Sequence, residues 1–229
     1  MVKLIIFDLD DTLYDCSNTL VVRGRRRVAR TIAGIINCTE EEAYLLQSEI
    51  EEEYGTKVNI YEKIVAIYRL PRKYIREFLE EFIQIEISDI TPFPDVITIL
   101  KKLKAQGYTL ALVTSGEEQI QTRKIEVLGL SGSYFDDILI ARRDTPPTKK
   151  DHFRNIIQRY RVKQEEIICV GDKIDDELTA GKSLGITTVM IEHGRHYKAY
   201  VKEPEKHIKP DYFIKNISCL HNVLAMRDL

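Results

Sequence analysis

The sequence predicts an α/β protein in which helices flank a central parallel sheet and a helical bundle is inserted after the first strand. An apolar, β-favouring run at 4–7 leads directly into a cluster of acids. The next stretch, to about Glu86, has a helical pattern of apolar residues. From Thr109 onward, strand and helix patterns alternate, which is typical of a parallel sheet covered on both faces.

The inserted segment has the pattern of four helices. The Thr39 hydroxyl can cap a helix start, and Glu42, three residues on, completes a capping box. Gly55 is a typical helix terminator. We expect helices over Thr19–Ile36, Thr39–Tyr54 and Lys57–Tyr68, and a fourth with Pro71 in its first turn that runs through Phe82.

The remaining elements follow in alternation. The segment 91–94 ends the insertion, and a helix is expected next, over Asp95–Gln106. Strands are expected over Thr109–Thr114, Asp137–Ala141, Glu166–Val170 and Ile186–Ile191, with a short late strand at Asp211–Ile214. The intervening helices are expected over Glu117–Leu128, Lys149–Arg161 and Asp175–Leu184, with a last helix from about Ile217.

Composition excludes several classes of protein. With 229 residues and 44% hydrophobic residues, the chain can bury a sizeable core. The net charge of −2 leaves no global electrostatic footprint for nucleic acid. We see neither a signal peptide nor an apolar run of membrane-spanning length, so we expect a cytoplasmic protein without a membrane partner. The abundance of Ile, Glu, Lys and Arg, with no Trp, resembles proteins of heat-loving organisms.

The cysteines, the arginines of the first inserted helix and two histidines are more typical of structural than of catalytic roles. The four cysteines form no Cys-x-x-Cys pair, and Cys169, inside an apolar strand, is expected to be a buried hydrophobe. The first inserted helix carries an arginine stripe, which is typical of a solvated face: Arg23, Arg26, Arg27 and Arg30. His193 and His196 are expected to be surface histidines rather than a metal pair, because we see no further ligand cluster around them.

The acids after the first strand are the strongest candidates for chemistry. Asp8 and Asp10 are two residues apart, so in extended geometry their side chains share one side of the chain. Two such carboxylates repel each other unless a metal, a cation or a shared proton compensates them.

Three later segments carry matching polar groups. Thr114 and Ser115 end a strand just before a helix, where unpaired amides favour an anion. Lys149 begins a helix and can present an ammonium to the acids, with Lys150 as the alternative. Asp172 follows the next strand, and Asp176 lies four residues further on, with Asp175 and Glu177 as close rivals.

Taken together, these motifs resemble those of the haloacid dehalogenase superfamily of phosphohydrolases. The resemblance rests on Asp-x-Asp-x-Thr at 8–12 and Gly-Asp-x-x-x-Asp at 171–176, in the family's order. Lys149 departs from the commoner family pattern, in which a Lys-Pro pair lies further upstream of the aromatic position, here Phe153. The resemblance implies a Rossmann-like catalytic core of residues 1–14 and 91–229, and a C1-type helical cap of residues 15–90.

The resemblance also implies a role for each residue. Asp8 would attack phosphorus to form an aspartyl phosphate, and Asp10 would act as general acid and then base. Mg²⁺ would be held by the Asp8 carboxylate, the Asp10 backbone carbonyl and the Asp172 carboxylate. Phosphate oxygens would be bound by Thr114, Ser115 and Lys149, or Lys150 in place of Lys149, and Asp176 would complete the acidic patch behind the metal.

The favoured hypothesis is a Mg²⁺-dependent phosphatase of small phosphorylated metabolites, such as sugar phosphates or nucleoside monophosphates. It would act as a monomer or small homo-oligomer without nucleic acid. Asp10 favours a phosphatase over a dehalogenase, because the family's dehalogenases lack that acid. Two alternatives stay open: a phosphomutase of the β-phosphoglucomutase type, and a non-enzymatic phospho-acceptor module.

Overall fold

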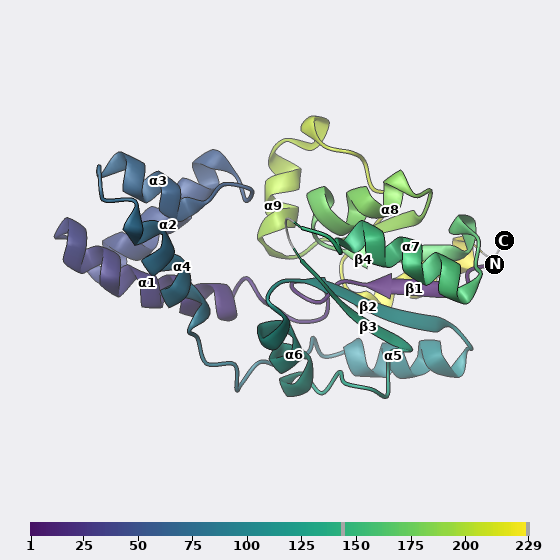
Figure 1. Ribbon diagram of the computed structural model, residues 1–229. Coiled ribbons are helices and arrows are strands. Elements are labelled where there is room, and N and C mark those ends of the chain that lie inside the picture. The colour runs from purple at the N-terminus through teal and green to yellow at the C-terminus, as the bar shows by residue number, and fades with distance from the viewer. Residues whose placement is uncertain (143–144, 228–229) are drawn as a thin grey trace. The chain divides into compact units, whose positions relative to one another are not determined.

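The computed structural model describes residues 1–142 and 145–227 and divides the chain into two compact units. The first unit joins Met1–Asp15 to Ser88–Leu229, and we call it the core unit. The second unit, Cys16–Ile87, contains the helices that follow the first strand, and we call it the insert. Figure 1 shows both, with the insert coloured purple to blue.

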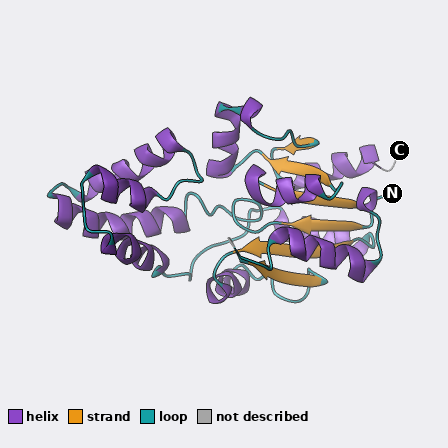
Figure 2. Cartoon of the chain, turned by 45° about the horizontal axis from the view of Figure 1, so that its top comes forward, coloured by secondary structure: helices purple, strands orange, loops and turns teal. Residues whose placement is uncertain are grey.

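A single parallel sheet forms the centre of the core unit (Figure 2). The strands lie in the order β3-β2-β1-β4-β5-β6, and every described neighbouring pair is parallel. The sheet confirms the α/β class expected from the sequence. Its strands are β1 (Leu4–Phe7), β2 (Thr109–Ser115), β3 (Asp137–Ala141), β4 (Ile167–Gly171), β5 (Thr187–Ile191) and β6 (Tyr212–Ile214).

The register of β1 places its last residue one residue before the end of β4 and three residues before the end of β2. Phe7, its last residue, lies opposite Leu112 of β2 and Val170 of β4. The backbone N–H of Asp8 still donates to the Val170 carbonyl at 2.9 Å, so the chain stays in the sheet one residue beyond the strand. The residues that follow β1, β2 and β4 therefore emerge at the same edge.

Helices cover both faces of the sheet, with α7 and α8 opposite α5 and α6 (Figure 1). The α7 face is closed by a buried cluster that includes Phe153, Ile6 and Cys169, so Cys169 is the buried hydrophobe that was expected. The helices of the core unit are α5 (Val96–Ala105), α6 (Glu118–Val127), α7 (Lys149–Tyr160), α8 (Thr179–Ser183), α9 (Gly194–Lys202) and α10 (Leu220–Arg227).

The insert has its own apolar core, built around Phe78 and Ile32. The capping box at Thr39 is present as predicted: its hydroxyl accepts from the Glu42 backbone, and the Glu42 carboxylate accepts from the Thr39 backbone. The four helices are α1 (Leu20–Ile36), α2 (Glu40–Tyr54), α3 (Ile60–Ile67) and α4 (Lys73–Ile83).

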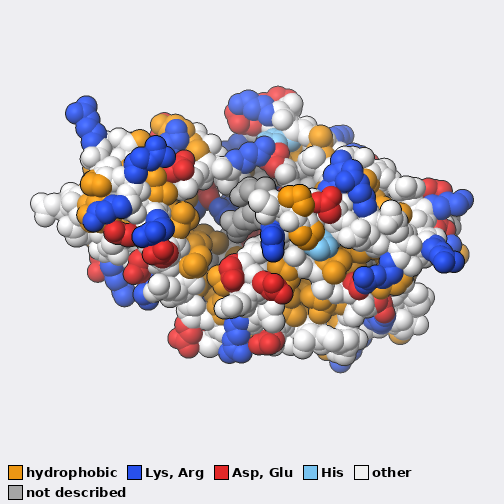
Figure 3. Space-filling view, in the orientation of Figure 1, with side chains coloured by type: hydrophobic (Ala, Val, Ile, Leu, Met, Phe, Trp, Pro, Cys, Tyr) orange, Lys and Arg blue, Asp and Glu red, His pale blue; other side chains and the backbone are white. Residues whose placement is uncertain are grey.

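The arginine stripe of α1 pairs with glutamates of neighbouring helices. Arg26 and Arg30 pair with acids at the start of α2, and Arg27 pairs with Glu81 of α4. These ion pairs are exposed, and such pairs contribute little stability each. On the face of the molecule in Figure 3, basic and acidic side chains are interspersed rather than gathered by sign.

The structure corrects several expected element bounds. Helix α3 begins at Ile60 because the Asn59 side chain caps its first amides. Helix α4 begins at Lys73, so Pro71 precedes it instead of lying in its first turn. Residues 194–202, which were not expected to be helical, form α9. The helix expected from Asp175 opens instead as a π-helical segment, Ile174–Leu178.

The chain leaves and re-enters the core unit at adjacent positions. The Phe93 backbone donates to the Leu13 carbonyl at 2.9 Å. Tyr14 and Pro92 form an isolated antiparallel bridge. The core-unit segments on either side of the insert are therefore tied together by backbone hydrogen bonds.

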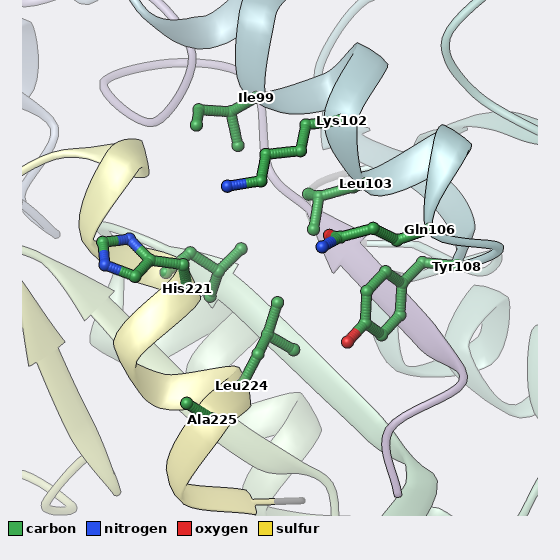
Figure 4. A pocket seen from close by; sticks show the side chains of 9 residues that line it. Ile99, Lys102, Leu103, Gln106, Tyr108, His221, Leu224 and Ala225 are labelled. Carbon is green, nitrogen blue, oxygen red and sulfur yellow. The ribbon is translucent and has the colours of Figure 1, made fainter.

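A cavity of about 230 Å³ lies between α5 and α10 (Figure 4). Leu103 and Ile99 contribute to its wall from α5, and Leu224 and His221 from α10. None of its lining residues belongs to the acid cluster predicted at the strand ends.

Over residues 1–142 and 145–227, every helix is too short or too polar to cross a bilayer.

Replacing Phe153 by alanine should destabilise the core unit by about 3 to 5 kcal/mol, because it leaves a cavity between α7 and the sheet. Urea unfolding followed by circular dichroism measures this loss. Gln158→Ala, at an exposed position of the same helix, is the control and should change stability by less than about 0.5 kcal/mol. Equal midpoints for the two variants would contradict the packing described here.

Candidate active site

Three side chains predicted from the sequence lie at the carboxyl ends of the central strands. Asp8 follows β1, Thr114 lies at the end of β2, and Asp172 follows β4. All three are almost completely buried, with exposed fractions of 5%, 1% and 2%. Carboxylates at such depth need compensating charge or hydrogen bonds.

Lys149 supplies that charge. It is the first residue of α7, which Thr148 and Asp151 open with a capping box. The Lys149 ammonium donates to an Asp8 carboxylate oxygen at 2.6 Å and to Glu177 at 2.7 Å, and lies 3.4 Å from Asp176. A cation at a helix start is otherwise unfavourable, and these acids offset that cost.

Of the two adjacent lysines considered in the sequence, the structure brings Lys149 to the acids. The described contacts of the acid cluster include Lys149 and not Lys150, which is half-buried at the next position of α7.

The π-helical segment brings two acids to the cluster. Asp176 accepts from the Ser115 hydroxyl at 3.1 Å. Glu177 is 1% exposed and also accepts from the Lys173 backbone at 2.6 Å. A Cβ on Gly171 would lie 2.3 Å from a Glu177 oxygen, so this approach requires glycine there.

Asp175, the third acid of this segment, takes a different partner. Its carboxylate lies 3.5 Å from a ring nitrogen of His207. Asp176 and Glu177 are therefore the two acids of the segment that contact Lys149.

Asp10 has a separate set of partners. The Lys124 ammonium lies 2.9 Å from both of its carboxylate oxygens. The Tyr14 hydroxyl donates to it at 2.5 Å, and the Gln121 amide at 3.4 Å. Lys124 and Gln121 project from α6, the helix that follows β2, and both are buried.

These environments move the pKa values of the two aspartates in opposite directions. Burial raises the pKa of Asp8 from 3.8 to about 7, although Lys149 lowers it. Burial also acts to raise the pKa of Asp10, but Lys124 and Tyr14 outweigh it and lower that pKa to about 2. The pKa of Asp172 is raised well above its usual range, by burial first and by the neighbouring acids next.

Asp8, Asp172 and Glu177 offer oxygen atoms that all lie within 4.8 Å of one another. One oxygen of Asp172 is buried and has no hydrogen-bond partner among the described residues. An all-oxygen set of this kind suits a hard divalent cation such as Mg²⁺.

The partners of Asp10 were not predicted from the sequence. Gln121 and Lys124 occupy positions of α6 that face inward together with Ile125. Polar residues at inward positions of an amphipathic helix are a signal that can be recognised. Their partner, however, lies more than a hundred residues earlier in the chain.

Curated proteins that are similar to this chain include phosphatases. The chain is 28% identical over 228 residues to a glyceraldehyde 3-phosphate phosphatase of Methanocaldococcus jannaschii, covering 98% of this chain and 97% of that protein. It is 28% identical over 195 residues to a phosphoglycolate phosphatase of Aquifex aeolicus, covering 84% and 85% of the two chains.

A solved structure shows the same architecture. The crystal structure of a HAD phosphatase from Thermococcus onnurineus aligns with a TM-score of 0.61 and 26% identity, over 97% of this chain and 98% of that one. The family model of haloacid dehalogenase-like hydrolases matches residues 5–191, which span the sheet from β1 to β5 and every acid described above. The resemblance expected from the sequence is thus confirmed, and the chain belongs to the haloacid dehalogenase-like hydrolase family.

Proposed function

We propose that this hydrolase is a Mg²⁺-dependent phosphatase that cleaves small phosphate monoesters through a phosphorylated Asp8. The observation that carries the proposal is the buried contact of Asp8 with Lys149, with Asp172 in the same group of carboxylates. Such a cluster pairs a nucleophile with a cation and has donors for a metal ion, as phosphoryl transfer requires.

The residues present suit a magnesium ion. Asp8 and Asp172 are the carboxylate ligands that the resemblance implies. One buried Asp172 oxygen, which no described residue contacts by a hydrogen bond, is a natural donor. Glu177 adds a third carboxylate that the family pattern did not predict. When bound, Mg²⁺ would neutralise charge on the transferring phosphoryl group.

Asp8 and Asp10 would divide the chemistry between them. An Asp8 carboxylate oxygen forms a bond to phosphorus while the bond from phosphorus to the alcohol oxygen breaks, and Asp10 gives that oxygen a proton. A water molecule then attacks the phosphorus of the aspartyl phosphate. Asp10 accepts the proton of that water, and inorganic phosphate leaves while the Asp8 carboxylate is restored.

Lys149, Thr114 and Ser115 would bind the phosphoryl oxygens. The Lys149 ammonium is already held against Asp8, where the phosphoryl group must arrive. Thr114 and Ser115 end β2 ahead of α6, and Ser115 donates to Asp176, which lies beside Lys149. Charge on the phosphoryl oxygens is greatest in the transition state, so these donors stabilise that state most.

Short phosphorylated metabolites are the proposed substrate class. The relatives named above are phosphatases of glyceraldehyde 3-phosphate and of phosphoglycolate, which are both small phosphate monoesters. We propose that the inserted helices, residues 15–90, act as a cap that excludes water and selects among such substrates. Residues 1–14 and 91–229 would then be the catalytic core.

The direct test is phosphate release from a panel of small phosphate monoesters, with and without Mg²⁺. Asp8→Asn should lower kcat by about a thousandfold or more, because an amide cannot act as the nucleophile. Asp175→Asn, in an acid that pairs with His207, is the matched control and should keep most of the activity. Isomerisation of a sugar phosphate without phosphate release would indicate a phosphomutase, and full activity of Asp8→Asn would refute the proposal.

Stabilisation by Mg²⁺ should depend on pH. The pKa of Asp8 is 3.8 when unfolded and about 7 in the metal-free fold, so stability of that fold falls as pH rises from about 4 to 7. Above pH 7 the folded protein carries the carboxylate that binds the metal. Adding Mg²⁺ should therefore raise Tm more at pH 8 than at pH 6, in scanning calorimetry. Asp172→Asn should lose most of this shift, whereas an equal shift at both pH values would contradict the assignment.

Lys124→Met should raise the pKa of Asp10 by about one unit or more, because it removes the cation that holds that pKa near 2. Carboxyl carbon NMR across a pH titration measures the change. Lys150→Met, which removes a lysine outside the Asp10 contacts, is the control. An unchanged Asp10 pKa in Lys124→Met would show that the ion pair does not form in solution.

A further inference from the structure

A second set of metal-ligating side chains lies at the same edge of the sheet. Asp11, Asp15 and His193 each offer one ligand atom, and these atoms all lie within 4.8 Å of one another. Asp11 is buried, and the side chains of Asp15 and His193 are about one-third exposed. None of the three has a role in the proposed phosphatase chemistry.

The contact between Asp15 and His193 has the geometry of two ligands of one ion. His193 Nε2 lies 3.2 Å from an Asp15 carboxylate oxygen. That nitrogen is buried and has no hydrogen bond among the described residues, so the contact lacks hydrogen-bond alignment. Two donors about 2.1 Å from a shared tetrahedral ion lie about 3.4 Å apart, close to this separation.

The backbone holds Asp11 and His193 together. Asp11 has φ 55°, an uncommon conformation for a residue with a side chain. Gly194, directly after His193, has φ 78°, and a Cβ there would lie 2.7 Å from Asp11 Cβ. The glycine therefore allows the Asp11 carboxyl group to approach the His193 loop.

Two further features fit an ion at this place. The His193 ring packs edge-on against Phe93, with the ring centroids 5.0 Å apart, which fixes its orientation. The sequence analysis found no further ligand cluster around His193, and the structure corrects this by placing Asp11 and Asp15 beside it. Thr12, which is completely buried and has a hydroxyl without a partner among the described residues, lines a cavity of about 380 Å³ together with His193.

We propose that Asp11, Asp15 and His193 form a second divalent-cation site, distinct from the site of Asp8 and Asp172. An imidazole with two carboxylates is a donor set for zinc and similar transition ions, whereas Mg²⁺ prefers oxygen ligands alone. A bound ion would fix Asp15, the last residue of the core unit before the insert. It would thereby set the point at which the chain leaves the core.

The test is the zinc content of the full chain after dialysis against Zn²⁺, measured by mass spectrometry. The comparison uses the natural protein, His193→Ala, Asp15→Asn and Asp172→Asn. His196→Ala is the matched control, because it removes the other histidine of the same segment. Circular dichroism checks that each variant is folded.

His193→Ala and Asp15→Asn should each bind one equivalent of zinc fewer than the natural protein, and His196→Ala should bind as much as the natural protein. Co²⁺ should give a visible absorption band, typical of low coordination with a nitrogen ligand, that Asp172→Asn keeps and His193→Ala loses. Unchanged zinc content in both His193→Ala and Asp15→Asn would overturn the second site and leave the proposed phosphatase untouched.

Discussion

The site depends on one interaction: the ammonium group of Lys149 is buried among several carboxylates. Lys149 contacts Asp8 and Glu177 directly, and Asp176 lies close by. Carboxylates gathered at this depth repel one another, and without a buried cation they would take up protons or turn away. Their attraction raises the pKa of Lys149 well above its usual range, although burial opposes the charge. The position of α7, which begins at this lysine, is therefore part of the electrostatics of the site.

Much of the sheet could be predicted because buried parallel strands have a simple pattern. Apolar runs bounded by polar residues identified β1, β3 and β4, and the parallel arrangement then placed the acids that follow β1 and β4 at one edge. The capping box at Thr39 could also be predicted from the sequence, because it depends on two residues that are three apart in the chain. Local patterns thus account for most of the framework.

The features that could not be predicted depend on contacts between distant residues. The π-helical segment carries Glu177, whose partner Lys149 lies on another helix. Lys124 meets Asp10 across more than a hundred residues of chain. Helix α9 begins at a glycine with positive φ, which usually ends helices rather than opening them. In each case a tertiary contact, and not a local preference, fixes the geometry.

Asp8 and Asp10 are two residues apart in one loop, yet the pKa of Asp8 is raised and that of Asp10 is lowered. Each has its own lysine from a different helix, and their pKa values differ by several units. While it is paired with Lys124, Asp10 is a carboxylate, the form that accepts a proton from water. In the proposed mechanism, Asp10 must also give a proton to the leaving group, which requires that its pairing with Lys124 be relaxed.

The hydrogen bond from Phe93 to Leu13 and the bridge between Tyr14 and Pro92 have a consequence for evolution. Backbone hydrogen bonds join the core-unit residues on either side of the insert. The insert can therefore be replaced without separating these residues. Its length and sequence can change, or another module can take its place, while the strand order and the acids at the sheet edge stay as they are. If the insert selects substrates as proposed, new substrate ranges can arise by exchange of this segment while the acids of the core unit are kept.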